Sequence, residues 1–129
     1  MSESLRLSKL LNNLNPVLDE HLYVFVCTQD LDKIGLQDIL CLYKEKEGIT
    51  LVLPQEIANI HELEYSEIYA KISLQVYSSL NDVGLTAAVS TQLGNYNIPC
   101  NVIAAYHHDH IFVPANQKKE AMKALLGLQ

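Results

Sequence analysis

Two stretches 60 positions apart in this chain of 129 residues follow the same pattern. In each stretch, 50–54 and 110–114, an apolar run typical of a strand ends at a proline that leads into helical periodicity. Proline is favoured in the first turn of a helix, so each stretch reads as a strand followed by a helix. Half of this chain is too short to form a stable core alone. The pattern therefore predicts a tandem of small α+β units that share a sheet or pack their sheets together.

The clearest strand signal is the alternation from Ile68 to Tyr77, where every second residue is apolar. Alternation of this kind predicts a sheet with one face covered by helices and the other more polar. A first helix is expected to be capped by Ser4 and to end before Asn15-Pro16. The other expected elements are strands at 22–28, 39–44, 49–53, 98–106 and 111–113, a hairpin turn at 44–48, and helices at 54–60, 84–96 and 116–126.

The last of these helices has its apolar residues on one side. We expect its core face to consist of Ala121, Met122, Leu125 and Leu126.

Charge and hydropathy exclude two classes of partner. Fifteen acidic residues outnumber nine basic ones, giving a net charge of −6, and a chain without a basic stripe does not attract nucleic acid. No apolar run reaches the roughly 18–20 residues that span a bilayer, and the first 14 residues do not resemble a signal peptide. We therefore expect a cytoplasmic protein without membrane partners. Cys27, Cys41 and Cys100 lie in apolar runs and are expected to be buried, reduced thiols.

The connection at 78–86 joins a strand to a helix and is the main candidate for a ligand site. Unpaired backbone N–H groups at the front of a helix can bind a carboxylate or phosphate. Gly84 allows a close approach of the backbone or a positive φ. Asp82 could either cap the helix or face the ammonium group of a ligand. The residues expected to contact a ligand here are Asn81, Asp82, Val83, Gly84, Leu85 and Thr86.

The turn at 107–110 contains three histidines and one aspartate. Imidazole and carboxylate groups are good transition-metal ligands, but four adjacent residues cannot close a tetrahedral shell alone. We therefore expect neither a metal nor a cofactor. Two interpretations stay open: a polar turn in which Asp109 bonds to local backbone, or a ligand or subunit contact through His108 or His110.

Residues 84–94, followed by Asn97-Ile98, resemble the first loop and helix of ACT domains. The stretch 106–114, with 51–54, resembles a subgroup of small bacterial ACT-domain proteins, and the resemblance covers about residues 8 to 127. It implies ferredoxin-like βαββαβ-type units in tandem, with antiparallel sheets and helices on one face. It also implies an amino-acid or other small-molecule site at the turn matching 81–86, often at a dimer interface. The division is expected as 1–65, a helix and a degenerate first half, and 66–129, the half with the glycine turn.

Enzyme signatures such as the P-loop, GxGxxG, GxSxG and HExxH do not occur in this sequence. We therefore expect no enzymatic activity but a stand-alone regulatory module, a homodimer that binds an amino acid or a similar anionic metabolite. The alternative is a dimerisation or protein-interaction module without a small ligand. Tyrosines such as Tyr69, Tyr77 and Tyr106 suit either an interface or a ligand pocket.

Overall fold

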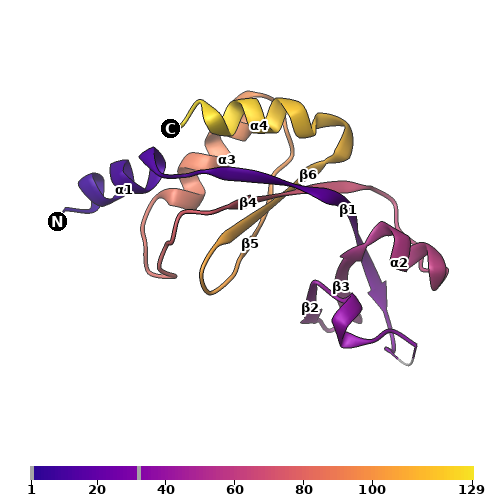
Figure 1. The fold of residues 1–129 in the computed structure, drawn as a ribbon. Coiled ribbons are helices and arrows are strands. Elements are labelled where there is room, and N and C mark those ends of the chain that lie inside the picture. The colour runs from indigo at the N-terminus through magenta and orange to yellow at the C-terminus, as the bar shows by residue number, and fades with distance from the viewer. Residues whose placement is uncertain (1, 32) are drawn as a thin grey trace. The chain divides into compact units, whose positions relative to one another are not determined.

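The computed structural model describes residues 2–31 and 33–129 as an α+β fold (Figure 1). The helices are α1 (Glu3–Asn12), α2 (Gln55–Ile60), α3 (Leu85–Asn95) and α4 (Lys118–Leu126), with 3₁₀ turns η1 (Leu36–Asp38) and η2 (Ala115–Gln117). The strands are β1 (Pro16–Thr28), β2 (Cys41–Lys44), β3 (Ile49–Pro54), β4 (Tyr69–Leu74), β5 (Asn101–Ala104) and β6 (Asp109–Pro114). The α+β class expected from the repeated pattern is confirmed. None of the helices in the described ranges combines the length and apolarity that a bilayer-spanning helix needs.

The chain forms two compact units, which are described separately. The central unit is Glu20–Tyr69, and the terminal unit is Met1–Asp19 together with Ala70–Gln129. Hydrogen-bonded strands follow the order β2-β3-β1 in the central unit and β1-β4-β6-β5 in the terminal unit. Strand β1 therefore contributes residues to both units. The pairs β1–β3, β2–β3 and β5–β6 are antiparallel.

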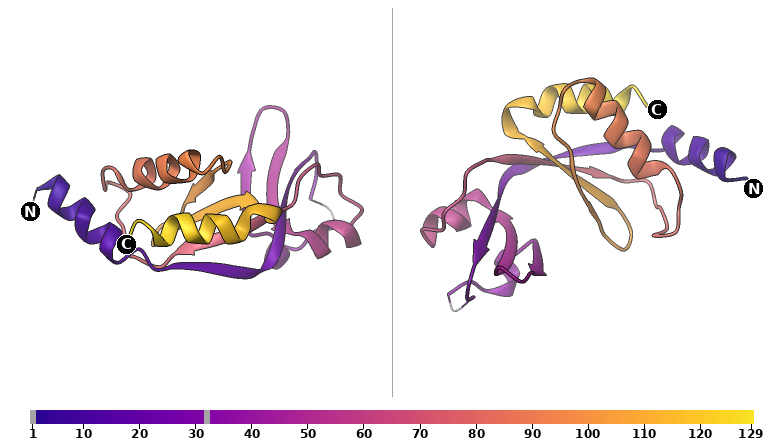
Figure 2. Two further views of the ribbon diagram at one scale, coloured as in Figure 1. Left: turned by 90° about the horizontal axis from the view of Figure 1, so that it is seen from above. Right: turned by 180° about the vertical axis from the view of Figure 1, so that it is seen from behind.

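The predicted alternation is present along β4, which covers 69–74 rather than the predicted 68–77 and, apart from Tyr69, belongs to the terminal unit. Ala70, Ile72 and Leu74 are buried, while Tyr69, Lys71 and Ser73 are partly exposed. Helices α3 and α4 lie beside each other on one face of these strands (Figures 1 and 2). Burial of apolar surface between this face and the helices holds the unit together. The helical residues buried there are Leu85, Val89 and Leu93 of α3 and Ala121, Ala124 and Leu125 of α4.

In the central unit, the predicted hairpin joins β2 to β3, and the Glu45 N–H donates to the Gly48 carbonyl at 2.9 Å. Gly48 has a φ of 156°, a value that glycine adopts without a side-chain clash. Among its described residues, the connection after β1 contains no α-helix and includes η1. A small core of residues from β1, β3 and α2 stabilises this unit: Val24, Val26, Leu51, Leu53 and Ala58.

Several local expectations were wrong. Ser2 rather than Ser4 caps α1, because the Ser2 hydroxyl accepts the Leu5 N–H at 3.2 Å. Strand β1 begins at Pro16, since a proline can occupy the first residue of a strand. Pro54 leads directly into α2 as predicted, but Pro114 leads into η2, and α4 begins only at Lys118.

The expectation of buried thiols was also wrong. Cys27 is exposed, because side chains alternate along β1 and its neighbour Val26 faces the core. Cys41 and Cys100 are partly exposed, and all three cysteines are free.

The core face of α4 was predicted only in part. Ala121 and Leu125 are buried, whereas Met122 is only partly buried and Leu126 is 49% exposed. Ala124 takes the remaining core position, because residues three and four apart share a helix face.

Leu125→Ala and Leu126→Ala form a matched test of this face. Leu125 is fully buried, so its truncation should cost about 2–5 kcal/mol in the free energy of unfolding. Leu126→Ala should cost no more than about 0.5 kcal/mol. Urea denaturation measures both values, and equal losses would contradict the assigned helix face.

Candidate functional site

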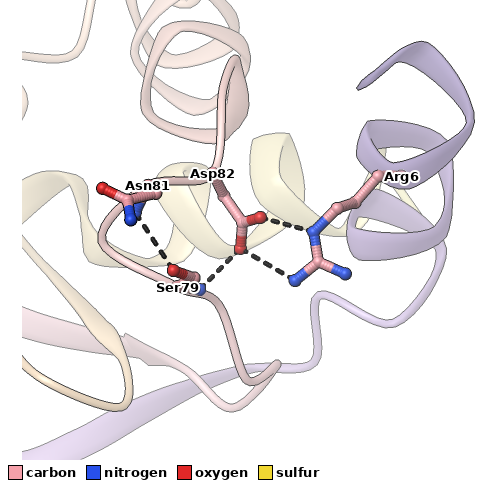
Figure 3. Close-up of polar contacts among 4 residues, drawn as sticks. All are labelled: Arg6, Ser79, Asn81 and Asp82. Atoms are coloured by element: carbon pink, nitrogen blue, oxygen red, sulfur yellow. Dashed lines mark hydrogen bonds and ion pairs between the residues drawn. The ribbon is translucent and has the colours of Figure 1, made fainter. Parts of the chain in front are cut away.

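The connection between β4 and α3 is a compact turn built from its own polar groups (Figure 3). The Asp82 N–H donates to the Ser79 carbonyl at 3.0 Å, and the Ser79 N–H donates to Asp82 Oδ2. The Asn81 N–H donates to Ser79 Oγ at 3.1 Å. Aspartate and serine side chains favour such turns because they satisfy nearby backbone groups. The turn therefore has a defined shape just before α3 begins.

Helix α1 is joined to this turn by an ion pair. Arg6 Nε donates to Asp82 Oδ1, and Arg6 Nη2 donates to Oδ2 at 3.2 Å (Figure 3). This two-point geometry is the preferred one for arginine and a carboxylate. The hydrogen bond from Arg6, with that from the Ser79 backbone, lowers the pKa of Asp82. Asp82 therefore does not cap α3, which corrects one of the two roles expected for it.

Gly84 is the N-cap residue of α3 and has the positive φ, 99°, that the sequence suggested. A Cβ atom at this position would lie 3.0 Å from Leu7 Cδ2 of α1, so the glycine also permits close packing. The Ala88 N–H is bonded to the Gly84 carbonyl at 2.9 Å, which leaves the amides before it without an intrahelical acceptor. No side chain in the described ranges caps this helix.

A small cavity of about 60 Å³ lies beside the first turn of α3. Leu85 and Thr86 line it from the helix, and Asp82 lines it from the turn. Asn81 lines a larger neighbouring groove instead. Gly84 and Val83 line neither space, and Val83 is exposed. The remaining residues around the small cavity are Ser78, Ser79, Leu80, Ala104, Ala105 and Asp109.

Asp109 is the cavity residue that the sequence analysis did not select. The residue is only 9% exposed, and among the described residues we find no donor to its carboxylate, whose oxygens are open to the cavity. Burial raises the pKa of Asp109, a nearby Asp82 raises it further, and His110 and His108 oppose the shift. Of the two interpretations of the histidine-rich turn, the one in which Asp109 bonds to local backbone was wrong, because Asp109 begins β6 and its carboxylate accepts no hydrogen bond from the described residues. Its spacing of two from the apolar Ile111 could have revealed that it faces inward.

His108 and His110 are engaged elsewhere. His108 Nδ1 donates to the Val76 carbonyl at 3.2 Å, and His110 Nδ1 lies 2.7 Å from Ser73 Oγ. Side chains alternate along a strand, so His110, the residue after Asp109 in β6, points away from the face that Asp109 occupies. Burial, with the nearby Lys71, lowers the pKa of His110. Neither histidine lines the cavity, so the structure does not bring them together with residues 81–86.

No group of three or more metal-ligating side chains converges in the part of the chain that the structure describes.

Family comparisons agree with this architecture. One ACT-domain model matches residues 4–70, and a second ACT-domain model matches residues 64–126. The chain belongs to the ACT-domain family. None of the curated proteins compared with it matches significantly. The ferredoxin-like α+β fold implied by the sequence resemblance is thereby confirmed.

Solved structures show the same relationship. A Vibrio cholerae protein of unknown function, named as a possible transport protein, is 39% identical, with a TM-score of 0.82 and 95% of both chains covered. An Agrobacterium tumefaciens protein is 13% identical over 88% of this chain and 87% of its own, with a TM-score of 0.66. The ligand-free regulatory subunit of Thermus thermophilus aspartate kinase is 10% identical over 91% of this chain and 98% of its own, also with a TM-score of 0.66. The last two likenesses concern the fold alone.

Gly84→Ala and Gly94→Ala should change stability in opposite directions. An alanine at position 84 must adopt an unfavourable positive φ, at a cost of about 1–3 kcal/mol in the free energy of unfolding. Gly94 lies within α3 with open space around it, so alanine there should stabilise the protein by up to about 1 kcal/mol. Urea denaturation of both variants checks this. Two changes of the same sign would refute the proposed role of the Gly84 backbone.

Asp109→Asn should become more stabilising, relative to the wild type, as the pH rises. Because its pKa is raised on folding, the folded protein holds this proton more tightly than the unfolded chain does. The cost of the buried charge is thus absent below the pKa of the unfolded chain. It grows as the pH rises towards the raised pKa of the folded state and then stays constant. Denaturation midpoints of the wild type and of Asp109→Asn across a pH series measure this difference in stability. A difference that does not change with pH would be inconsistent with a buried, titrating Asp109.

Proposed function

We propose that this ACT-domain protein is a regulatory module that binds an amino acid in the cavity at the front of α3. The observation that carries the proposal is the meeting of two groups of opposite polarity in one small space. Asp109, a residue only 9% exposed, supplies a carboxylate that accepts no hydrogen bond from the described residues and stays open to the cavity, and the first turn of α3 supplies uncapped amides.

A zwitterion suits this arrangement better than a purely anionic metabolite. A buried carboxylate is costly unless a cation or donor reaches it, and a ligand ammonium group meets that need. The amides and the helix dipole favour a carboxylate close by. A ligand carrying only negative charge would instead meet Asp109 and Asp82.

In this proposal Asp82 has a structural role and does not contact the ligand. Its oxygens are already occupied by Arg6 and the Ser79 N–H, so it holds the turn in shape. Asp109 is then the carboxylate with free acceptor capacity in the cavity.

The family relationship supports a regulatory rather than a chemical role. The Thermus thermophilus structure of the same fold is named as a regulatory subunit. An amino acid held by Asp109 and the α3 amides would be bound and released unchanged. We therefore propose no enzymatic activity for this site.

A thermal-shift screen against the amino acids, each paired with its analogue lacking the amino group, tests the proposal. Ligand at 100 times its Kd should stabilise the folded protein by about 2.7 kcal/mol. The analogues without an ammonium group should give little or no shift. Asp109→Asn should abolish the response, because a neutral amide cannot neutralise the ammonium group.

Asp38→Asn is the matched control, since Asp38 lies in the central unit and does not line this cavity. It should leave the shift unchanged. A folded wild-type protein that responds to no amino acid, or an equal response in Asp109→Asn, would refute the proposal.

A second candidate, a dimerisation module, rests on exposed apolar side chains of the central unit. Leu36, Tyr43 and Ile60 are 77%, 68% and 72% exposed. A contiguous exposed apolar patch often marks a protein contact, and this candidate requires the three side chains to form one. Sedimentation velocity of the wild type and of Ile60→Asp tests whether the protein dimerises through these side chains. A wild-type monomer would remove this candidate.

A further inference from the structure

A groove of about 500 Å³ lies directly next to the small cavity and shares Ser78, Ser79 and Leu80 with it. The small cavity, at about 60 Å³, has room for the charged groups of a ligand but not for a large side chain. Small-molecule sites commonly occupy about 300–1,000 Å³, a range that the groove meets. An amino acid whose charged end occupies the cavity would therefore extend its side chain into the groove.

The groove has aromatic walls. Tyr77 is 74% exposed and Tyr106 is 79% exposed, and both line it together with His107. The His107 ring meets Tyr106 edge-to-face at a centroid distance of 4.9 Å, and Tyr77 edge-to-face at 6.1 Å. Tyr77 also contacts His108, at 4.8 Å. The ring contacts thus hold the side chains in place, while most of the surface of each tyrosine remains accessible to a ligand.

The charges along the groove disfavour a charged ligand side chain. No carboxylate is among its lining residues, so a basic side chain would find no counter-ion there. The arginine that lines it, Arg6, is already paired with Asp82 (Figure 3), so an acidic side chain would compete with that pair. A neutral side chain with flat faces fits these surroundings best, because aromatic rings gain from stacked and edge-to-face contacts beyond simple burial.

We infer that the site selects amino acids with planar aromatic side chains, which lie in the groove between Tyr77 and Tyr106. This inference rests on the proposed function, because the charged end of the ligand must first occupy the cavity at Asp109. It goes further by naming the class of ligand and the two tyrosines that determine specificity.

The composition of the chain offers a direct measurement. The protein has no tryptophan, so the indole fluorescence of added L-tryptophan can be excited where tyrosine does not absorb. Binding should raise the fluorescence anisotropy of L-tryptophan as protein is added. Competition against bound L-tryptophan then ranks the other ligands: L-phenylalanine, L-tyrosine, L-leucine, L-alanine, L-arginine and L-glutamate.

The aromatic amino acids should bind about tenfold more tightly than L-leucine, and more tightly still than L-alanine. Tyr106→Ala should remove most of the advantage over L-leucine, whereas Tyr106→Phe should keep it, since the ring face remains. Tyr43→Ala, which removes an exposed tyrosine of the central unit, should change nothing. Thermal shift ranks the same ligands independently if L-tryptophan itself does not bind.

The outcomes separate this inference from the proposed function. If L-leucine or L-arginine binds as tightly as the aromatic ligands, or if Tyr106→Ala keeps the full preference, the inference is overturned while amino-acid binding stands. If no amino acid binds to the folded wild type by either measurement, both fail. If aromatic ligands bind best and Asp109→Asn loses them all, both are supported.

Discussion

The left-handed backbone at Gly84 is the constraint on which the candidate site depends. A positive φ at this one residue turns the chain from the Ser79–Asp82 turn into α3 without a capping side chain. It also brings the turn against Leu7 of α1. As a result, the front of the helix, Asp82 and Asp109 all line one small cavity, and Arg6, the partner of Asp82, lines the groove next to it. A residue with a side chain at position 84 would disturb each of these together.

Much of the fold could be predicted because its signals are local. The alternation at 68–77, the hairpin at 44–48 and the strand–proline pattern all depend on neighbours along the chain. The structure contains the alternation over 69–74 and the hairpin, and a proline leads directly into an α-helix at Pro54 but not at Pro114. The positive φ of Gly84 could also be predicted. The partner of Asp82 was not, since Arg6 lies 76 residues away and only folding brings the two together. Asp109 was missed because its histidine neighbours suggested a turn, although its spacing from Ile111 marked the inward face.

The two repeats show how one pattern can be specialised. After β4, the chain forms a turn and an 11-residue helix, and the front of that helix has a cavity beside it. After β1, the described residues of the corresponding connection contain the 3₁₀ turn η1 and no α-helix. A 3₁₀ turn of three residues aligns fewer peptide dipoles than the 11 residues of α3 do. The small cavity is lined by residues of the second repeat, whereas Arg6 of α1 lines the groove next to it.

Strand β1 is a single piece of backbone that contributes its first residues to the terminal unit and its later residues to the central unit. There is consequently no seam between the units at which the polypeptide could be cut and rejoined without interrupting a strand. An exchange of the central unit alone would cut β1 between Asp19 and Glu20, so both parts of the strand would have to regain their pairing in the new protein.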